Sequence, residues 1–238
     1  MKVNDRYCSF YYLNDRDYGP VEIDPAKTAL LIVDMQHVFI TRPDNPDPTE
    51  EDRFHAEAWE QFYQAIDETV VPNNRRLLDA CRSLGVEVMF AKIQCRKEGG
   101  EERSLDHKAS GYNELLLLPG DPRAEIVPEL APAENEIVFL KTTDSALTGT
   151  NLRLTLSNMG IDTVIVTGVL TDQCVSGTVR SLADESFRVW LIEDATRAAT
   201  QEIQDAELAI LNNIYCHVIN TEECIQALTE QAGEYEKL

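Results

Sequence analysis

Residues 163–180, TVIVTGVLTDQCVSGTVR, decide the fold. The first five form a β-branched run typical of a strand buried in a parallel sheet, and Gly168 is predicted to end that strand. The helical pattern resumes at Cys174, so we expect this thiol at a helix N-terminus. Unpaired backbone N–H groups and the helix dipole favour the thiolate there, which suits a nucleophile. Free cysteines are more often small buried hydrophobes, so a structural role stays open at this point.

The same strand and helix pattern recurs on both sides of this stretch. Residues 29–33, ALLIV, are continuously apolar, which predicts a strand covered on both faces, and Asp34 follows at its carboxyl end. Further strands are predicted at residues 86–93, 136–140, 189–192 and 217–219, and helices at 55–84 (two helices, the second from Pro72), 151–159, 174–187, 200–214 and 222–231. This alternation predicts right-handed βαβ units and a Rossmann-like, three-layer α/β/α sandwich around a parallel sheet of about six strands.

Three segments lie outside this pattern. Residues 41–53 are rich in Pro and Asp and are predicted to be an irregular loop, and residues 94–113 form a second polar loop. Residues 1–24 are predicted to be an arm, separate from a domain at 25–238. The aromatic residues of the arm would be buried against the domain or a neighbouring subunit; they are Tyr7, Phe10, Tyr11 and Tyr12.

Composition excludes several classes of partner. The chain has 238 residues with 21 basic against 42 acidic side chains, a net charge of -21, so neither nucleic acid nor an anionic membrane is an expected partner. Six cysteines are scattered without a CxxC pair, which favours free thiols. The N-terminus has no apolar signal core, and no stretch reaches the length of a membrane span. We therefore expect a cytoplasmic protein.

Three chemically complementary groups follow predicted strands. The carboxylate of Asp34, the amine of Lys141 and the thiol of Cys174 could supply the base, the charge stabiliser and the nucleophile of acyl transfer. Two alternatives remain. A redox or thiol-binding protein could use Cys174, although no resolving cysteine stands at CxxC spacing. A non-catalytic, ligand-binding α/β domain is the other, although DMQHVF after the first strand is neither a G-x-G-x-x-G nor a Walker loop.

Three motifs around these residues resemble the isochorismatase-like cysteine hydrolases. They are DMQHVF at Asp34, FLKTTDSALTGTNL at Lys141 and GVLTDQCV at Cys174, and the resemblance extends over about residues 27–225. It implies an amidohydrolase that cleaves the C–N bond of a small amide, carbamoyl or ureido compound through a thioester acyl-enzyme. It also implies that Asp34 is the general base, Lys141 the stabilising cation and Cys174 the nucleophile. The vinyl-ether hydrolases of the family lack the cysteine, so Cys174 favours C–N cleavage.

The resemblance implies further details of the site. The backbone N–H groups of Leu170 and Cys174 would form the oxyanion hole, on a turn that follows a cis peptide between Val169 and Leu170. Phe39 and Val169 are expected to line the substrate pocket. Zinc-dependent relatives take ligands from an Asp-x-His arrangement after the second strand, where this chain reads KIQCRKEGG, so no metal or other cofactor is expected. A homo-oligomer, a dimer or tetramer, is expected because relatives usually form one.

Overall fold

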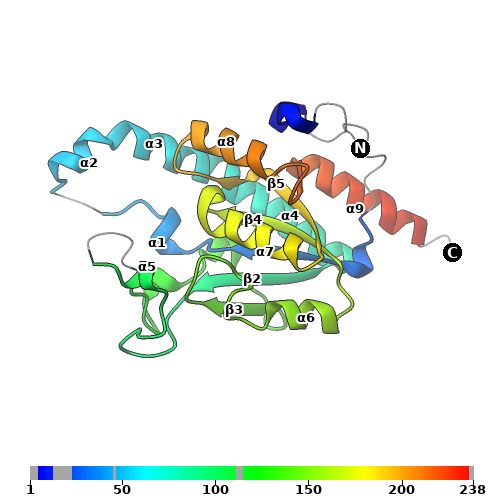
Figure 1. Cartoon of the computed structure of the whole chain (residues 1–238), viewed down its shortest axis with the longest axis horizontal. Coiled ribbons are helices and arrows are strands. Elements are labelled where there is room, and N and C mark those ends of the chain that lie inside the picture. The colour runs from blue at the N-terminus through cyan, green and yellow to red at the C-terminus, as the bar shows by residue number, and fades with distance from the viewer. Residues whose placement is uncertain (1–4, 13–22, 45–46, 111–114, 236–238) are drawn as a thin grey trace.

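A single parallel sheet forms the centre of the molecule (Figure 1). The computed structural model of the protein describes residues 5–12, 23–44, 47–110 and 115–235. The six strands within them lie in the order β3-β2-β1-β4-β5-β6, and every neighbouring pair is parallel. They are β1 (Thr28–Val33), β2 (Glu87–Ile93), β3 (Ile137–Lys141), β4 (Thr163–Val169), β5 (Arg188–Arg197) and β6 (His217–Ile219).

Helices cover both faces of this sheet. The described helices are α1 (His37–Ile40), α2 (Glu50–Phe54), α3 (Ala56–Ala65), α4 (Val71–Leu84), α5 (Leu105–Lys108), α6 (Leu152–Asn158), α7 (Ser176–Asp184), α8 (Gln201–Leu211) and α9 (Thr221–Tyr235). Helices α4 and α9 pack against one face, whereas α6, α7 and α8 pack against the other. The predicted three-layer α/β/α sandwich is therefore confirmed.

Shorter helical turns connect these elements. The 3-10 turns are η1 (Asp5–Tyr7), η2 (Phe10–Tyr12), η3 (Pro25–Lys27), η5 (Pro122–Ala124) and η6 (Pro128–Leu130), and the π-helical turns are η4 (Ile66–Val70) and η7 (Thr171–Val175). None of the helices in the described part of the chain is long and apolar enough to span a bilayer.

The central strand β1 shows why its sequence is continuously apolar. Ala29, Leu31 and Val33 belong to the core on the α6, α7 and α8 side. Leu30 and Ile32 belong to the core on the α4 and α9 side. All five are at most 1% exposed, because side chains alternate across a strand and helices cover both faces of the sheet.

The end of β4 differs from the prediction. The strand does not stop at Gly168 but continues to Val169, and Gly168 has a φ of 112°. A Cβ at this position would lie 1.9 Å from the carbonyl oxygen of Val33, so only glycine lets β4 approach β1 this closely. The helix also starts earlier than predicted: η7 begins at Thr171, and Cys174 lies within this π-helical turn. The thiol of Cys174 therefore lies in a π-helical turn and not at the start of an α-helix.

The segment between β1 and β2 is more helical than its composition suggested. The prediction that residues 41–53 are irregular was wrong at their end, because α2 begins at Glu50. Thr49 and Asp52 form a capping box there, which satisfies N–H groups of the first turn. Helices α3 and α4 follow without a break, joined by η4, and α2 and α3 project beyond the sheet (Figure 1).

Strand β5 is also longer than predicted, because it covers Arg188–Arg197 and the prediction covered residues 189–192.

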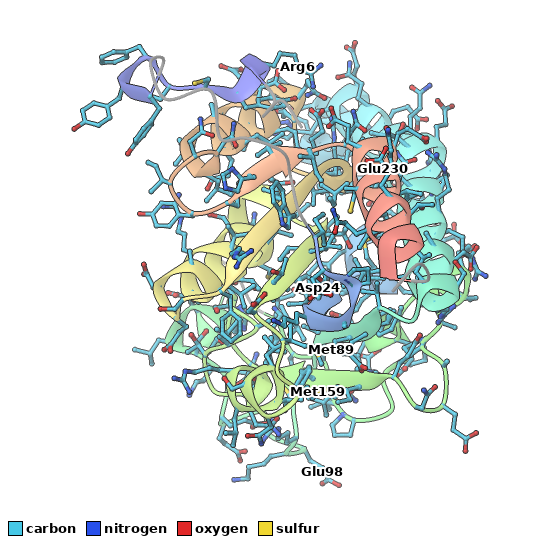
Figure 2. The ribbon with its side chains drawn as sticks, turned by 90° about the vertical axis from the view of Figure 1, so that its right-hand side faces the viewer. Arg6, Asp24, Met89, Glu98, Met159 and Glu230 are labelled. Atoms are coloured by element: carbon cyan, nitrogen blue, oxygen red, sulfur yellow. The ribbon has the colours of Figure 1, made fainter. Side chains whose placement is uncertain are left out.

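The N-terminal segment is only partly anchored. Tyr7 is 5% exposed and packs on the α8 side of the core, where its carbonyl oxygen accepts a hydrogen bond from Asn212 Nδ2 at 2.6 Å. In contrast, Phe10 and Tyr11 are 83% and 76% exposed, so they do not pack on the domain, and their burial against a neighbouring subunit stays a prediction. Figure 2 shows Arg6 at the periphery of the molecule. Residues 13–22 of the predicted arm lie outside the described residues.

Candidate active site

The three groups singled out from the sequence meet at the carboxyl ends of β1, β3 and β4. Asp34 follows β1, Lys141 is the last residue of β3, and Cys174 lies in η7 directly after β4. They are 1%, 1% and 5% exposed, respectively. Ligand sites of open parallel sheets form outside these strand ends. The sheet thus brings together residues that are more than 30 positions apart in the chain.

Lys141 links the other two side chains. Its Nζ lies 2.6 Å from Asp34 Oδ2 and donates a hydrogen bond to Cys174 Sγ at 3.3 Å. A second hydrogen bond goes to the carbonyl oxygen of Thr143 at 3.1 Å. The ion pair and the two hydrogen bonds together fix the position of the ammonium group. The arrangement holds a carboxylate and a thiol around one cation.

Burial and mutual attraction set the protonation of this group. Burial raises the pKa of the Asp34 carboxyl above its ordinary value, and the attraction of Lys141 only partly offsets that rise. The thiol of Cys174 has its pKa raised well above its ordinary value, by burial first and then by the charge of Asp34, while Lys141 lowers it. Burial lowers the pKa of Lys141, but Asp34 and Cys174 together outweigh this and raise it. A neutral thiol therefore lies beside the ion pair of Lys141 and Asp34.

The backbone around Asp34 is fixed by hydrogen bonds to the next strand. Asp34 has a φ of 51°, uncommon for a residue other than glycine, and its N–H donates to the carbonyl of Ala91 at 2.8 Å. Gln36 is fully buried, donates to the carbonyls of Ile93 and Ala124 at 2.9 and 2.8 Å, and accepts from the N–H of Ile93 at 2.9 Å. Gln36 therefore ties the chain after Asp34 to the end of β2.

The other predicted site residues lie at the end of β4, in the turn after it and in α1. The peptide bond between Val169 and Leu170 is cis. The carbonyl of Leu170 accepts from the N–H groups of Gln173 and Val175, which shapes η7. The side chain of Val169 is fully buried in the core, so it would reach a substrate only through its backbone. Phe39 is half-buried in α1 and packs against both core clusters. The roles assigned to these residues stay predictions.

Metal-ligating side chains are not grouped in the described part of the chain. There, no three or more His, Cys, Asp or Glu side chains are arranged to hold a metal ion. The expectation of a metal-free site remains a prediction.

A comparison with protein families decides where the chain belongs. The family model described as isochorismatase domain matches residues 28–223. The chain belongs to the isochorismatase family. The match covers all three motifs and ends before the last turns of α9.

Two of the relatives are named as an amidase and an amidohydrolase. The chain is 31% identical to an N-carbamoylsarcosine amidase of Arthrobacter over 68% of its own length and 62% of that protein, so the match spans less than two thirds of this relative. It is 29% identical to the ureidoacrylate amidohydrolase of Yersinia enterocolitica over 82% of this chain and 85% of the relative. The names of these relatives agree with the predicted amidohydrolase acting on non-peptide C–N bonds.

A solved structure supports the fold independently. A cysteine hydrolase from Pseudomonas syringae pv. phaseolicola superposes with a TM-score of 0.74, covering 89% of this chain and 97% of that one. At 23% identity this similarity shows the fold alone.

Sequence reasoning from the family motifs missed a carboxylate beside Cys174 and the histidine that contacts this carboxylate. Asp144 Oδ1 lies 3.8 Å from Cys174 Sγ, and its other neighbour is His107 Nε2 at 3.4 Å. Asp144 stands three residues after Lys141, within a motif already quoted, so its position in the chain was a usable signal. His107 comes from the polar segment after β2, and nothing in the sequence showed that this segment reaches Asp144.

Proposed function

We propose that this protein is a cysteine hydrolase that cleaves the C–N bond of a small amide, carbamoyl or ureido compound through a thioester acyl-enzyme. One observation carries the proposal: Lys141 Nζ contacts both Asp34 Oδ2 and Cys174 Sγ in a buried site. A nucleophile, a base and a cation in mutual contact are what acyl transfer requires. The names of the amidohydrolase relatives support the choice of bond.

The first half of the reaction uses all three side chains. Asp34 takes the proton of Cys174 as the thiol attacks the carbonyl carbon, and Lys141 stabilises the thiolate as it forms. The raised pKa of Asp34 suits this role, because a base is most effective when its pKa is near the working pH. The tetrahedral oxyanion accepts hydrogen bonds from the backbone N–H groups of Leu170 and Cys174. The C–N bond then breaks, and the nitrogen leaves as ammonia or an amine with the proton that Asp34 held.

The second half restores the enzyme. Asp34, ionised again, takes a proton from a water molecule that attacks the thioester carbonyl. The C–S bond breaks, the carboxylic or carbamic acid is released, and the proton returns to the sulfur of Cys174. Phe39 and the backbone of Val169 would border the bound acyl group.

We propose three properties of the whole molecule alongside this activity. Residues 1–24 form an arm and residues 25–238 the hydrolase domain, supported by the family match that starts at residue 28. The protein is a homo-oligomer, a dimer or tetramer, and a scattering mass near 26.8 kDa at micromolar concentration would contradict this. Its compartment is the reducing cytoplasm, supported by six cysteines that are all free thiols.

Ammonia release from a panel of compounds tests the proposed activity. The panel should hold primary amides, carbamoyl amino acids and ureido acids, each incubated with the protein and with Cys174→Ala. We expect at least one class to release ammonia only with the wild-type protein. Release that is equal for both proteins would contradict the cysteine mechanism, and no release from any class would contradict the amidohydrolase.

A further inference from the structure

A carboxylate that the mechanism does not use lies beside the nucleophile, and a buried histidine contacts this carboxylate. Asp144 Oδ1 is 3.8 Å from Cys174 Sγ, within reach of a thiol hydrogen bond. On its other side, the carboxylate oxygen is 3.4 Å from Nε2 of His107, whose side chain is fully buried. Asp144 comes from the loop after β3 and His107 from α5, so the two segments meet at the carboxylate of Asp144.

Asp144 differs from the triad in its access to solvent. Its side chain is 49% exposed, whereas Asp34, Lys141 and Cys174 are almost completely buried. The hydrogen bond to His107, which is the largest cause, lowers the pKa of Asp144 below its ordinary value, so it is ionised at neutral pH. The carboxylate therefore combines contact with the nucleophile and contact with solvent, from which a substrate arrives.

The position of Asp144 places an acceptor next to the scissile bond. A carbonyl carbon poised for attack lies about 3–3.5 Å from the nucleophile, and a nitrogen bonded to that carbon is little farther away. With Oδ1 at 3.8 Å from Sγ, a nitrogen on the Asp144 side of the thiol falls within ordinary hydrogen-bond distance of this oxygen. An ionised carboxylate only accepts hydrogen bonds, so it matches an N–H and repels a second carboxylate.

We propose that Asp144 is a specificity residue, which accepts a hydrogen bond from an N–H group of the compound bound at Cys174. The substrates would then carry a primary amide, carbamoyl or ureido N–H beside the attacked carbonyl. Esters and N,N-disubstituted amides lack this donor and are disfavoured. His107 is a positioning residue, because its Nε2 donates to Asp144 and holds the carboxylate towards the thiol. This inference rests on the proposed function and narrows its substrate class.

A different role for Asp144 gives a different result. As the base that deprotonates Cys174, it would change the supply of thiolate and so alter the rate with every reagent to the same degree. As a specificity residue, it changes the ratio of rates between a reagent with an N–H and one without. This ratio does not depend on the thiol pKa, because both reagents attack the same thiolate.

Alkylation provides this test without knowledge of the natural substrate. The rates of Cys174 alkylation by iodoacetamide and by 2-iodo-N,N-dimethylacetamide are measured by peptide mass spectrometry. The ratio of the two rates is then divided by the same ratio measured for a small free thiol, which removes the difference in intrinsic reactivity between the reagents. We expect a wild-type preference for iodoacetamide of about 10-fold or more, the range of a hydrogen bond to a charged group. Asp144→Leu, which keeps the bulk without an acceptor, should bring the ratio close to that of the free thiol.

Further variants separate charge, position and fold. Asp144→Asn keeps an acceptor oxygen and should give an intermediate ratio. His107→Phe should lower the ratio, and His107→Gln, which restores an N–H donor, should recover part of it. Asp106→Asn, on α5 next to His107, is the control and should leave the ratio unchanged. Matching far-UV spectra and melting temperatures exclude misfolding as the cause.

Two outcomes would overturn the inference in distinguishable ways. If the ratio in Asp144→Leu stays within twofold of wild type, Asp144 does not accept a hydrogen bond from the N–H of the bound compound, and the proposed function stands. If Cys174→Ala releases as much ammonia from the panel of compounds as the wild type, the proposed function fails and this inference fails with it.

Discussion

Replacing Lys141 with Met removes the cation that links Asp34 to Cys174 while keeping much of the side-chain volume. Across 3.3 Å, the attraction between the ammonium and a thiolate is about 5 kcal/mol at an effective dielectric constant of about 20. This would correspond to a rise of about 3–4 units in the thiol pKa. Without the cation, buried Asp34 also takes up a proton, which removes its repulsion of the thiolate and offsets part of the rise. We therefore expect a net rise of about 1–2 units and alkylation of Cys174 at pH 8 about 10- to 100-fold slower.

The assay is the rate of iodoacetamide labelling at Cys174 against pH for the wild type and Lys141→Met. Lys92→Met is a matched control, because Lys92 is also buried on the sheet but pairs with Glu125 at 3.1 Å, away from the thiol. This control should keep the wild-type profile. Loss of one partner from the buried pair also lowers the unfolding free energy by about 3–5 kcal/mol, so far-UV spectra must show that Lys141→Met is folded under the assay conditions. Coincident pH profiles for wild type and folded Lys141→Met would refute the electrostatic role of Lys141.

Three further predictions follow from the geometry. Gly168→Ala should lower the unfolding free energy by about 3 kcal/mol or more, because its Cβ would overlap the carbonyl of Val33 at a φ of 112°; a urea midpoint equal to that of wild type would refute the close approach. The kcat/KM should fall on the acid side at a pH above the ordinary carboxyl pKa of about 4, because Asp34 must be ionised and burial raises its pKa; a profile that stays flat down to pH 4 would exclude Asp34 as the base. Activity should survive exhaustive chelation, and a loss that zinc reverses would contradict the metal-free site.

The sequence predicted the order of strands and helices along the chain, because a strand that is buried on both faces of the sheet has a continuous run of apolar residues. The apolar run of β1 and the β-branched run of β4 could only be satisfied between two helical layers. The boundaries that were missed depend on tertiary contacts. Gly168 was taken as a strand end because glycine usually breaks a strand, whereas here it permits β4 to touch Val33. The helix at Glu50 was hidden by nearby prolines, although the Thr49 and Asp52 capping box could have been recognised.

The site was predicted in its residue types but not in its electrostatics. Strand ends and family motifs pointed to Asp34, Lys141 and Cys174, and the structure brings all three into contact. Burial raises the pKa of Cys174 more than Lys141 lowers it, and this effect of burial is not visible in a motif. His107 was not predicted because its approach to Asp144 depends on the path of a loop that sequence spacing does not determine.

Ammonia release by Cys174→Ser is the most direct test of the central claim that Cys174 is the nucleophile. The measurement compares wild type, Cys174→Ser and Cys95→Ser on a compound that wild type hydrolyses; Cys95 is a second buried, free cysteine. We predict a loss of about 1,000-fold or more for Cys174→Ser, because a serine hydroxyl is a far weaker nucleophile with a base matched to a thiol, and rates near wild type for Cys95→Ser. Turnover by folded Cys174→Ser within 10-fold of wild type would contradict the account.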